Sequence, residues 1–310
     1  MNKNIRVDIH ADDYGYSLST SKNILECLKA GCLDSISIIC NTNAFEESMD
    51  LLYKEIPNLP YLPKMSVHLN FVEGYNLSNS PLLSRDGINT SSWGDILIAS
   101  IGGMKKSLKE QMKNELKAQI EKTRVVIDKC IDLAKKNNVK YEQNGLRLDT
   151  HVHTHPIPLQ FEALCEVIKE NNYQVEYIRN PKEPLLPFIK KANLWSSYSP
   201  VNIAKNIILN VFSHKIDKYC DVNKLEKNYM WGLMMSGEMD FDRIKSLYGN
   251  MVTFAEKKNR DLEILFHPGI ALESEYSEEF KKEYFKNANL SKNRDIEKDA
   301  VMNIRELTNK

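Results

Sequence analysis

Short apolar runs alternate along the chain with stretches in which apolar residues recur at helical spacing. The short runs are typical of β-strands and cover residues 5–11, 35–40, 64–69, 145–151, 174–179 and 262–267. Helical spacing covers residues 18–30, 45–54, about 104–136, 159–171, 240–259 and 295–307. Strands that alternate with helices predict an α/β protein with a largely parallel sheet, which is either open or closed into a barrel.

Polar, reactive side chains stand at the carboxyl ends of several predicted strands. Because these ends gather on one rim of a parallel α/β fold, residues that are far apart in the sequence are expected to converge there. The residues at these positions are Asp12, Asp13, His68, His151, Arg179 and His267.

The stretch RLDTHVHTHPIP, residues 147–158, holds three of the seven histidines at alternate positions. In an extended segment alternate side chains project to the same side, so His151, His153 and His155 are expected to face one way. We interpret His151 as a metal ligand. We expect His153 and His155 to shape the pocket, either as contacts to the substrate or as partners of the ligands.

Asp13, His68 and His151 form a set of one carboxylate and two imidazoles that suits one divalent metal ion. A ligating imidazole needs an acceptor on its other ring nitrogen, and Asp149 is a candidate for that position. Two imidazoles and a carboxylate suit Zn²⁺, although Mg²⁺, Mn²⁺, Co²⁺ or Ni²⁺ can bind the same kind of set.

Two further groups complete the parts needed for hydrolysis. Asp12, next to the expected ligand Asp13, is placed to take a proton from a water whose pKa the metal lowers. His267, in the motif LFHPG, is a candidate acid that protonates a leaving amine. This combination of groups is suited to the hydrolysis of an amide or an ester.

The composition limits which partners are expected and indicates a cellular compartment. Lys plus Arg balances Asp plus Glu at 42 each, so no excess charge points to nucleic acid or to an anionic membrane. No apolar run approaches the ~18 residues of a membrane span, and the first residues lack the apolar core of a signal peptide. The six scattered cysteines indicate free thiols, so we expect a cytoplasmic protein.

Six motifs occur together in an order that resembles the YdjC-like carbohydrate deacetylases, a family that includes the chitooligosaccharide deacetylases. They are IHADDYGYS, SVHLNF, LDTHVHTHP, YIRNP, WGLMMSGEMD and EILFHPG. The resemblance implies a deformed (β/α) barrel related to polysaccharide deacetylases, and an N-acetylated sugar or short oligosaccharide as the substrate. It also implies the ligand set Asp13, His68 and His151, the base Asp12, the acid His267, and Arg179 lining the pocket.

The same resemblance implies one domain over residues 1–310. Within it, residues at about 104–136 form a helical insertion and residues at about 181–237 an irregular segment. We interpret these two segments as an interface in a homo-oligomer or as a lid. His10 stands where many members of the family have asparagine, and Val152 replaces a histidine of the cluster. Neither change removes an expected ligand.

Other functions fit parts of the sequence. The histidine cluster is also compatible with an amidohydrolase or phosphoesterase barrel, but in those enzymes the metal-binding H-x-H pair usually ends the first strand. The spacing of His10 and Asp12 is compatible with the facial triad of an iron oxygenase, but that site belongs to an all-β fold. A sugar-binding protein without turnover remains as a third alternative.

Overall fold

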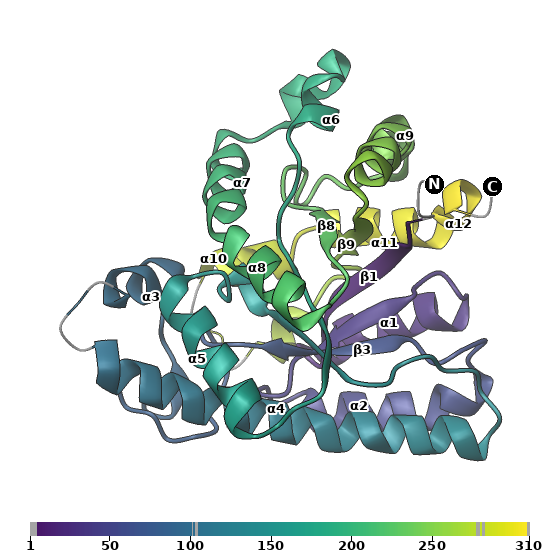
Figure 1. The fold of residues 1–310 in the computed structure, drawn as a ribbon. Coiled ribbons are helices and arrows are strands. Elements are labelled where there is room, and N and C mark those ends of the chain that lie inside the picture. The colour runs from purple at the N-terminus through teal and green to yellow at the C-terminus, as the bar shows by residue number, and fades with distance from the viewer. Residues whose placement is uncertain (1–4, 101, 103–104, 277–279, 281–282, 309–310) are drawn as a thin grey trace.

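The computed structural model describes residues 5–100, 102, 105–276, 280 and 283–308 (Figure 1). At its centre a seven-stranded, wholly parallel sheet curls into a half-barrel, with the strand order β7-β6-β3-β2-β1-β9-β8. The strands are β1 (Val7–Tyr14), β2 (Ser35–Ile38), β3 (Lys64–Leu69), β6 (Leu146–Thr150), β7 (Val175–Ile178), β8 (Asn228–Trp231) and β9 (Asp261–Phe266). The predicted α/β fold is confirmed.

Strands β7 and β8 lie at the two edges of the sheet and do not pair as strands. The chain that follows β7 nevertheless reaches β8. The backbone N–H of Met230 donates to the Lys182 carbonyl at 3.0 Å, and the backbone N–H of Asn180 donates to Asn228 Oδ1 at 3.1 Å. These bonds draw the two edges together, so the carboxyl ends of all seven strands surround one site.

Helices surround the sheet, and α1 shows the expected caps at both ends. Ser17 caps α1 (Leu18–Lys29) by accepting from the Thr20 N–H, and Gly31 follows that helix with a φ of 69°. The other helices are α2 (Phe45–Glu55), α3 (Trp93–Ala99), α4 (Lys105–Lys136), α5 (Pro158–Glu170), α6 (Leu186–Ile189), α7 (Pro200–Phe212), α8 (His214–Asn223), α9 (Phe241–Lys258), α10 (Glu283–Asn289), α11 (Asn293–Asn303) and α12 (Arg305–Thr308). A short hairpin, β4 (Ser84–Arg85) with β5 (Ile88–Asn89), precedes α3.

The two expected insertions differ in outcome. Helix α4 forms as predicted from residue 105 onward, while residues 103 and 104 lie outside the described residues. The segment 181–237 is not irregular as predicted, because it holds α6, α7, α8 and the seventh strand, β8. In Figure 1, α6 and α7 rise away from the sheet, whereas β8 lies beside β9. The segment therefore contributes to the barrel itself as well as to the projecting part.

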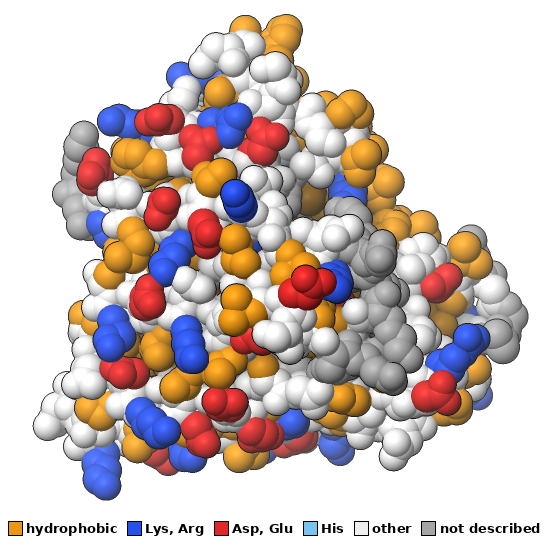
Figure 2. All heavy atoms as spheres, turned by 180° about the vertical axis from the view of Figure 1, so that it is seen from behind, with side chains coloured by type: hydrophobic (Ala, Val, Ile, Leu, Met, Phe, Trp, Pro, Cys, Tyr) orange, Lys and Arg blue, Asp and Glu red, His pale blue; other side chains and the backbone are white. Residues whose placement is uncertain are grey.

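The surface carries no dominant charge on the face that Figure 2 shows, where acidic and basic side chains are interspersed. All six cysteines, which lie in the described residues, are free thiols. Within the same residues, no helix combines the length and the apolar character that crossing a membrane requires.

Candidate active site

Strand β1 carries the groups of the candidate site on its inward face. Asp8, His10 and Asp12 alternate along the strand and are all buried inside the barrel. The strand ends with Asp13, whose φ of 70° places a residue other than glycine in the left-handed region. This turn of the backbone moves Asp13 out of the alternation, so Asp12 and its neighbour Asp13 both face the rim.

The three predicted metal ligands converge on this rim. A carboxylate oxygen of Asp13 and a ring nitrogen from each of His68 and His151 lie within 4.8 Å of one another, and all three residues are buried. The Asp13 Oδ1 atom lies 3.4 Å from His68 Nε2 and 3.1 Å from His151 Nδ1. Among the described residues, His68 Nε2 has no hydrogen-bond partner. A buried nitrogen in this state fits a metal ligand, because buried polar atoms are otherwise nearly always bonded.

Two carboxylates fix the tautomers of these imidazoles. His68 Nδ1 donates to Asp149 Oδ1 at 2.6 Å, and His151 Nε2 donates to Glu73 Oε1 at 3.0 Å. In each ring the remaining nitrogen faces Asp13, and once it has lost its proton it can offer its lone pair to a metal held there. Carboxylates that bind the outer nitrogen of a ligating histidine orient the ring and raise its affinity for a metal. The structure thus places Asp149 where the sequence predicted a partner of a ligand.

Glu73 was not predicted from the sequence. It lies in the loop after β3, where the side-chain amide of Asn70 donates to its carbonyl at 2.7 Å and that of Asn41 does so at 3.3 Å. Its Oε2 atom is buried and has no hydrogen-bond partner among the described residues. A buried glutamate four residues beyond a strand has no periodic signal, so only the folded loop brings it to His151.

Charged neighbours shift the proton affinities of the ligands. Burial alone lowers the pKa of both imidazoles, but Asp12 and Asp149 raise that of His68 to about 10, and Asp13 raises that of His151 to about 9. Burial would raise the pKa of Asp13, but the two imidazoles hold it well below its usual range. Without a metal the site therefore holds protons that a metal ion has to displace.

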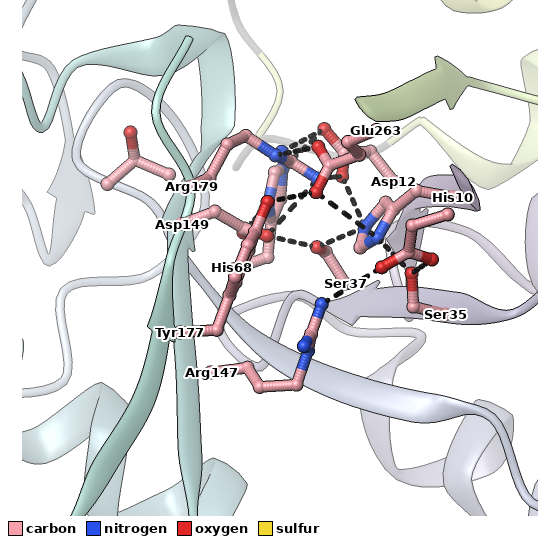
Figure 3. Close-up of polar contacts among 12 residues, drawn as sticks. His10, Asp12, Ser35, Ser37, His68, Arg147, Asp149, Tyr177, Arg179 and Glu263 are labelled. Atoms are coloured by element: carbon pink, nitrogen blue, oxygen red, sulfur yellow. Dashed lines mark hydrogen bonds and ion pairs between the residues drawn. The ribbon is translucent and has the colours of Figure 1, made fainter. Parts of the chain in front are cut away.

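Asp12, the predicted base, lies beside the candidate ligands and is held by Arg179 (Figure 3). The guanidinium donates to both carboxylate oxygens, from Nη2 to Oδ1 at 2.8 Å and from Nη1 to Oδ2 at 2.9 Å. Burial would raise the pKa of Asp12, but Arg179, His68 and His10 together hold it well below its usual value. Asp12 is therefore an ionised carboxylate throughout the neutral pH range.

His267, the predicted acid, lies opposite Asp12 at the end of β9. Its Nε2 is 4.0 Å from Asp12 Oδ2, and its side chain is 23% exposed. On the other side of the ring, Glu297 Oε2 lies 3.6 Å from Nδ1 and accepts from the His267 backbone N–H at 2.6 Å. Burial raises the pKa of Glu297 to about 7. Glu297 comes from α11, thirty residues further along, and nothing in the sequence predicted its position.

The predicted common orientation of the three alternating histidines is wrong. Strand β6 ends at Thr150, and residues 151–153 form a turn of 3₁₀ helix in which Val152 and His153 have φ values of 51° and 54°. His153 remains partly exposed, and its Nδ1 has no hydrogen-bond partner among the described residues. The ring of His155 instead faces the Thr150 hydroxyl and the Arg179 carbonyl.

His155 and Arg179 were predicted to contact substrate, and their burial argues otherwise. His155 is fully buried between Thr150 Oγ1 and the Arg179 carbonyl, each 2.7 Å from a ring nitrogen. The Arg179 side chain is also fully buried, and its guanidinium lies against three carboxylates, those of Asp12, Asp149 and Glu263. Both residues therefore hold the site together from behind.

Comparison with known proteins identifies a family model and several relatives of this chain. A family model described as YdjC-like protein matches residues 6–129. A carbohydrate deacetylase from Clostridium beijerinckii is 24% identical over 269 residues, which cover 83% of this chain and 98% of that protein. Another from Danio rerio is 25% identical over 188 residues, or 59% of this chain, and the match spans only about half (52%) of that protein. The resemblance predicted from the motifs is confirmed.

A solved structure from Enterococcus faecalis V583, described as a cellobiose-phosphate cleavage protein, has the same fold. It superposes with a TM-score of 0.56 at 17% identity and covers 97% of this chain and 91% of that chain. At this level of identity the likeness concerns the arrangement of strands and helices.

Proposed function

We propose that this chain, which resembles YdjC-like proteins and carbohydrate deacetylases, is a metal-dependent hydrolase that removes the acetyl group from an N-acetylated sugar or short oligosaccharide. The observation that carries the proposal is the convergence of Asp13, His68 and His151 beside an ionised Asp12. Asp13, His68 and His151 would hold the metal. When bound, the metal would polarise the acetyl carbonyl and lower the pKa of water.

The chain's own residues then supply the proton transfers. Asp12 accepts the proton of the attacking water, and its fixed bonds to Arg179 keep the carboxylate from rotating away. His267 donates a proton to the leaving amine nitrogen, with Glu297 beside its other nitrogen. Because Nε2 of His267 lies 4.0 Å from Asp12 Oδ2, base and acid face the same small volume. The partly exposed ring of His153 is left to contact the sugar.

Acetate release tests this proposal. The chain would be stripped with chelator, supplied with Zn²⁺, Mg²⁺, Mn²⁺, Co²⁺ or Ni²⁺ singly, and assayed with N-acetylglucosamine and diacetylchitobiose. We expect release to vanish on stripping and to return with at least one metal, which would also identify that metal. A tightly bound ion without acetate release from any of these sugars would contradict the deacetylase assignment and favour a binding protein or another hydrolase.

A further inference from the structure

His10 lies in the middle of the barrel, fully buried, and none of the roles described so far explains it (Figure 3). The parallel register of β1 with β2 pairs His10 with Ser35 and brings two serines of β2 to the ring. Nδ1 lies 2.6 Å from Ser35 Oγ, and Nε2 lies 2.7 Å from Ser37 Oγ. Nε2 is also 3.1 Å from Asp12 Oδ1. The ring therefore touches the predicted base directly.

The hydroxyl protons of both serines are already committed. Ser35 donates to Asp8 Oδ1 at 2.6 Å, and Ser37 donates to Asp149 Oδ2. Burial would raise the pKa of Asp8, but Arg147 and Arg6 lower it to about 2, so that carboxylate has no proton of its own. Asp149 is paired with Arg179 at 3.2 Å. Because a serine has only one hydroxyl proton, each serine can only accept from His10.

Two acceptors require two ring N–H groups. We propose that both ring nitrogens of His10 carry a proton and that this imidazolium positions the Asp12 carboxylate from inside the barrel. The charges around the ring agree with this state. Nε2 lies 3.1 Å from Asp12 Oδ1 and Nδ1 lies 3.9 Å from Glu263 Oε2, so a carboxylate stands near each ring nitrogen.

The same reasoning bears on whether a second group of residues holds a metal ion. His10, Asp12 and Asp149 also lie close enough together to hold an ion. An imidazolium has no lone pair for a metal, and the guanidinium of Arg179 already lies against both carboxylates. We therefore assign the metal to Asp13, His68 and His151 and not to this second group.

His155 provides an internal contrast within the same barrel. Its Nε2 donates to the Arg179 carbonyl, while the Thr150 hydroxyl is free to donate to its Nδ1. Burial lowers the pKa of His155 to about 4, so this ring is neutral and carries one N–H. Two equally buried histidines thus differ in charge, because the partners of one have protons to give and the partners of the other do not.

Nitrogen-15 NMR of the histidine rings tests the charge without requiring turnover. In the full chain at neutral pH, with and without Zn²⁺, we expect two ring N–H signals for His10 and one for His155. Loss of signal in His10→Gln assigns the ring. If that variant does not fold, through-space contacts to Ser35 and Ser37 assign it instead. A single N–H on His10 would overturn the proposal.

A pair of serine variants tests the positioning role, and this arm rests on the proposed deacetylase function. Ser35→Ala removes the acceptor at Nδ1 but leaves Asp12 and the ligands in place. We expect it to remove one His10 N–H and to lower kcat at least about tenfold, with KM and metal affinity unchanged. Ser66→Ala is the matched control, because Ser66 is a fully buried serine opposite Ser37 whose hydroxyl has no hydrogen-bond partner among the described residues.

The outcomes distinguish a failure of the positioning role of His10 from a failure of the proposed deacetylase function. Loss of the N–H in Ser35→Ala without any change in kcat would overturn the positioning role while leaving the deacetylase intact. An equal loss of kcat in Ser66→Ala would show a general packing effect and would also overturn it. If the wild type does not deacetylate any sugar, the NMR result still decides the charge of His10.

Discussion

At the scale of single residues, Glu73 is expected to set the metal affinity through His151. Glu73→Gln keeps a carbonyl acceptor for Nε2 but removes the negative charge that raises the basicity of the ring. We expect the affinity for Zn²⁺, measured by calorimetry on the stripped protein, to fall about tenfold. Glu115→Gln is the control, because Glu115 is equally buried but bonds to Ser78 and Gln119. Unchanged affinity in Glu73→Gln would contradict this role.

A second prediction for a single residue concerns Asp12 and its effect on turnover, not on metal binding. Asp12→Asn can no longer accept a proton, so we expect kcat to fall by about 10²–10⁴-fold while the metal content stays at the wild-type level. Asp34→Asn serves as the control, since that carboxylate pairs with Arg305 and lies outside the site. Near-normal kcat in Asp12→Asn, on a sugar that the wild type cleaves, would rule out Asp12 as the base.

The predicted site residues that the fold brings together share one property. Asp12, Asp13, His68 and His151 stand at strand ends, and parallel strands bring their carboxyl ends together whatever the sequence between them. Glu73 and Glu297 come from a loop and from a distant helix, so their positions depend on tertiary packing that no local pattern encodes. The predicted common orientation of the three alternating histidines failed for a related reason. The strand stops at Thr150, and the turn that follows does not keep the alternation of an extended chain.

At the scale of elements, the turn after β1 decides where Asp12 and Asp13 lie. Gly15 has a φ of 95°, and a Cβ there would stand 2.6 Å from the backbone carbonyl of Ile39. We expect Gly15→Ala to lower the free energy of unfolding by at least about 2 kcal/mol. Gly249→Ala, in the middle of α9 with nothing near its added Cβ, should instead stabilise by about 0.5–1 kcal/mol.

Denaturant unfolding of the two glycine variants measures this difference. If the Gly15→Ala protein is as stable as the wild type, the end of β1 can shift to make room for the added Cβ. The close approach of Gly15 to Ile39 would then not contribute to the stability of the protein. Metal affinity measured on the same variant reports whether a displaced strand end also disturbs Asp13.

Strand β8 shows why the element pattern was only partly predictable. Its four residues, Asn228–Trp231, are all buried, so no alternation of polar and apolar positions marks them as a strand. Longer elements, such as β3 and α4, carry enough periodic positions to be recognised. A short strand at the edge of a parallel sheet is defined by its neighbour β9 and by the bonds from the chain after β7.

At the scale of the whole molecule, groups buried around the barrel should set how stability depends on pH. Burial raises the pKa of Glu183 and of Glu297 from 4.5 to about 7. Neighbouring carboxylates raise that of His68 and His151 from 6.5 to about 10 and about 9, against the opposing effect of burial. Each raised pKa means that folding favours the protonated form, so its stabilisation is complete below the unfolded pKa and is lost as the pH rises through the folded one.

The two glutamates and the two histidines all make the folded protein less stable as the pH rises. His153 and His155 oppose the two glutamates below their unfolded pKa of 6.5, because burial lowers the pKa of these rings to about 3 and about 4. The metal-free protein should therefore lose stability mainly from about pH 7 to about pH 9, through His68 and His151. Asp8 opposes this only in acid, because its pKa of about 2 lies below the unfolded value of 3.8 and its contribution disappears as the pH falls through 2. Thermal unfolding of chelator-treated protein, followed by circular dichroism across this range, measures the trend.

Adding metal should reverse the alkaline part of this trend. A metal ion binds imidazoles that have lost their protons, so its stabilisation grows as the pH rises. We expect saturating Zn²⁺ to raise Tm more at about pH 8 than at about pH 6. A metal-free protein whose Tm rises between about pH 7 and about pH 9 would mean that His68 and His151 are not held protonated by their carboxylates. An equal Zn²⁺ effect at both pH values would mean that the metal does not compete with protons at these two rings.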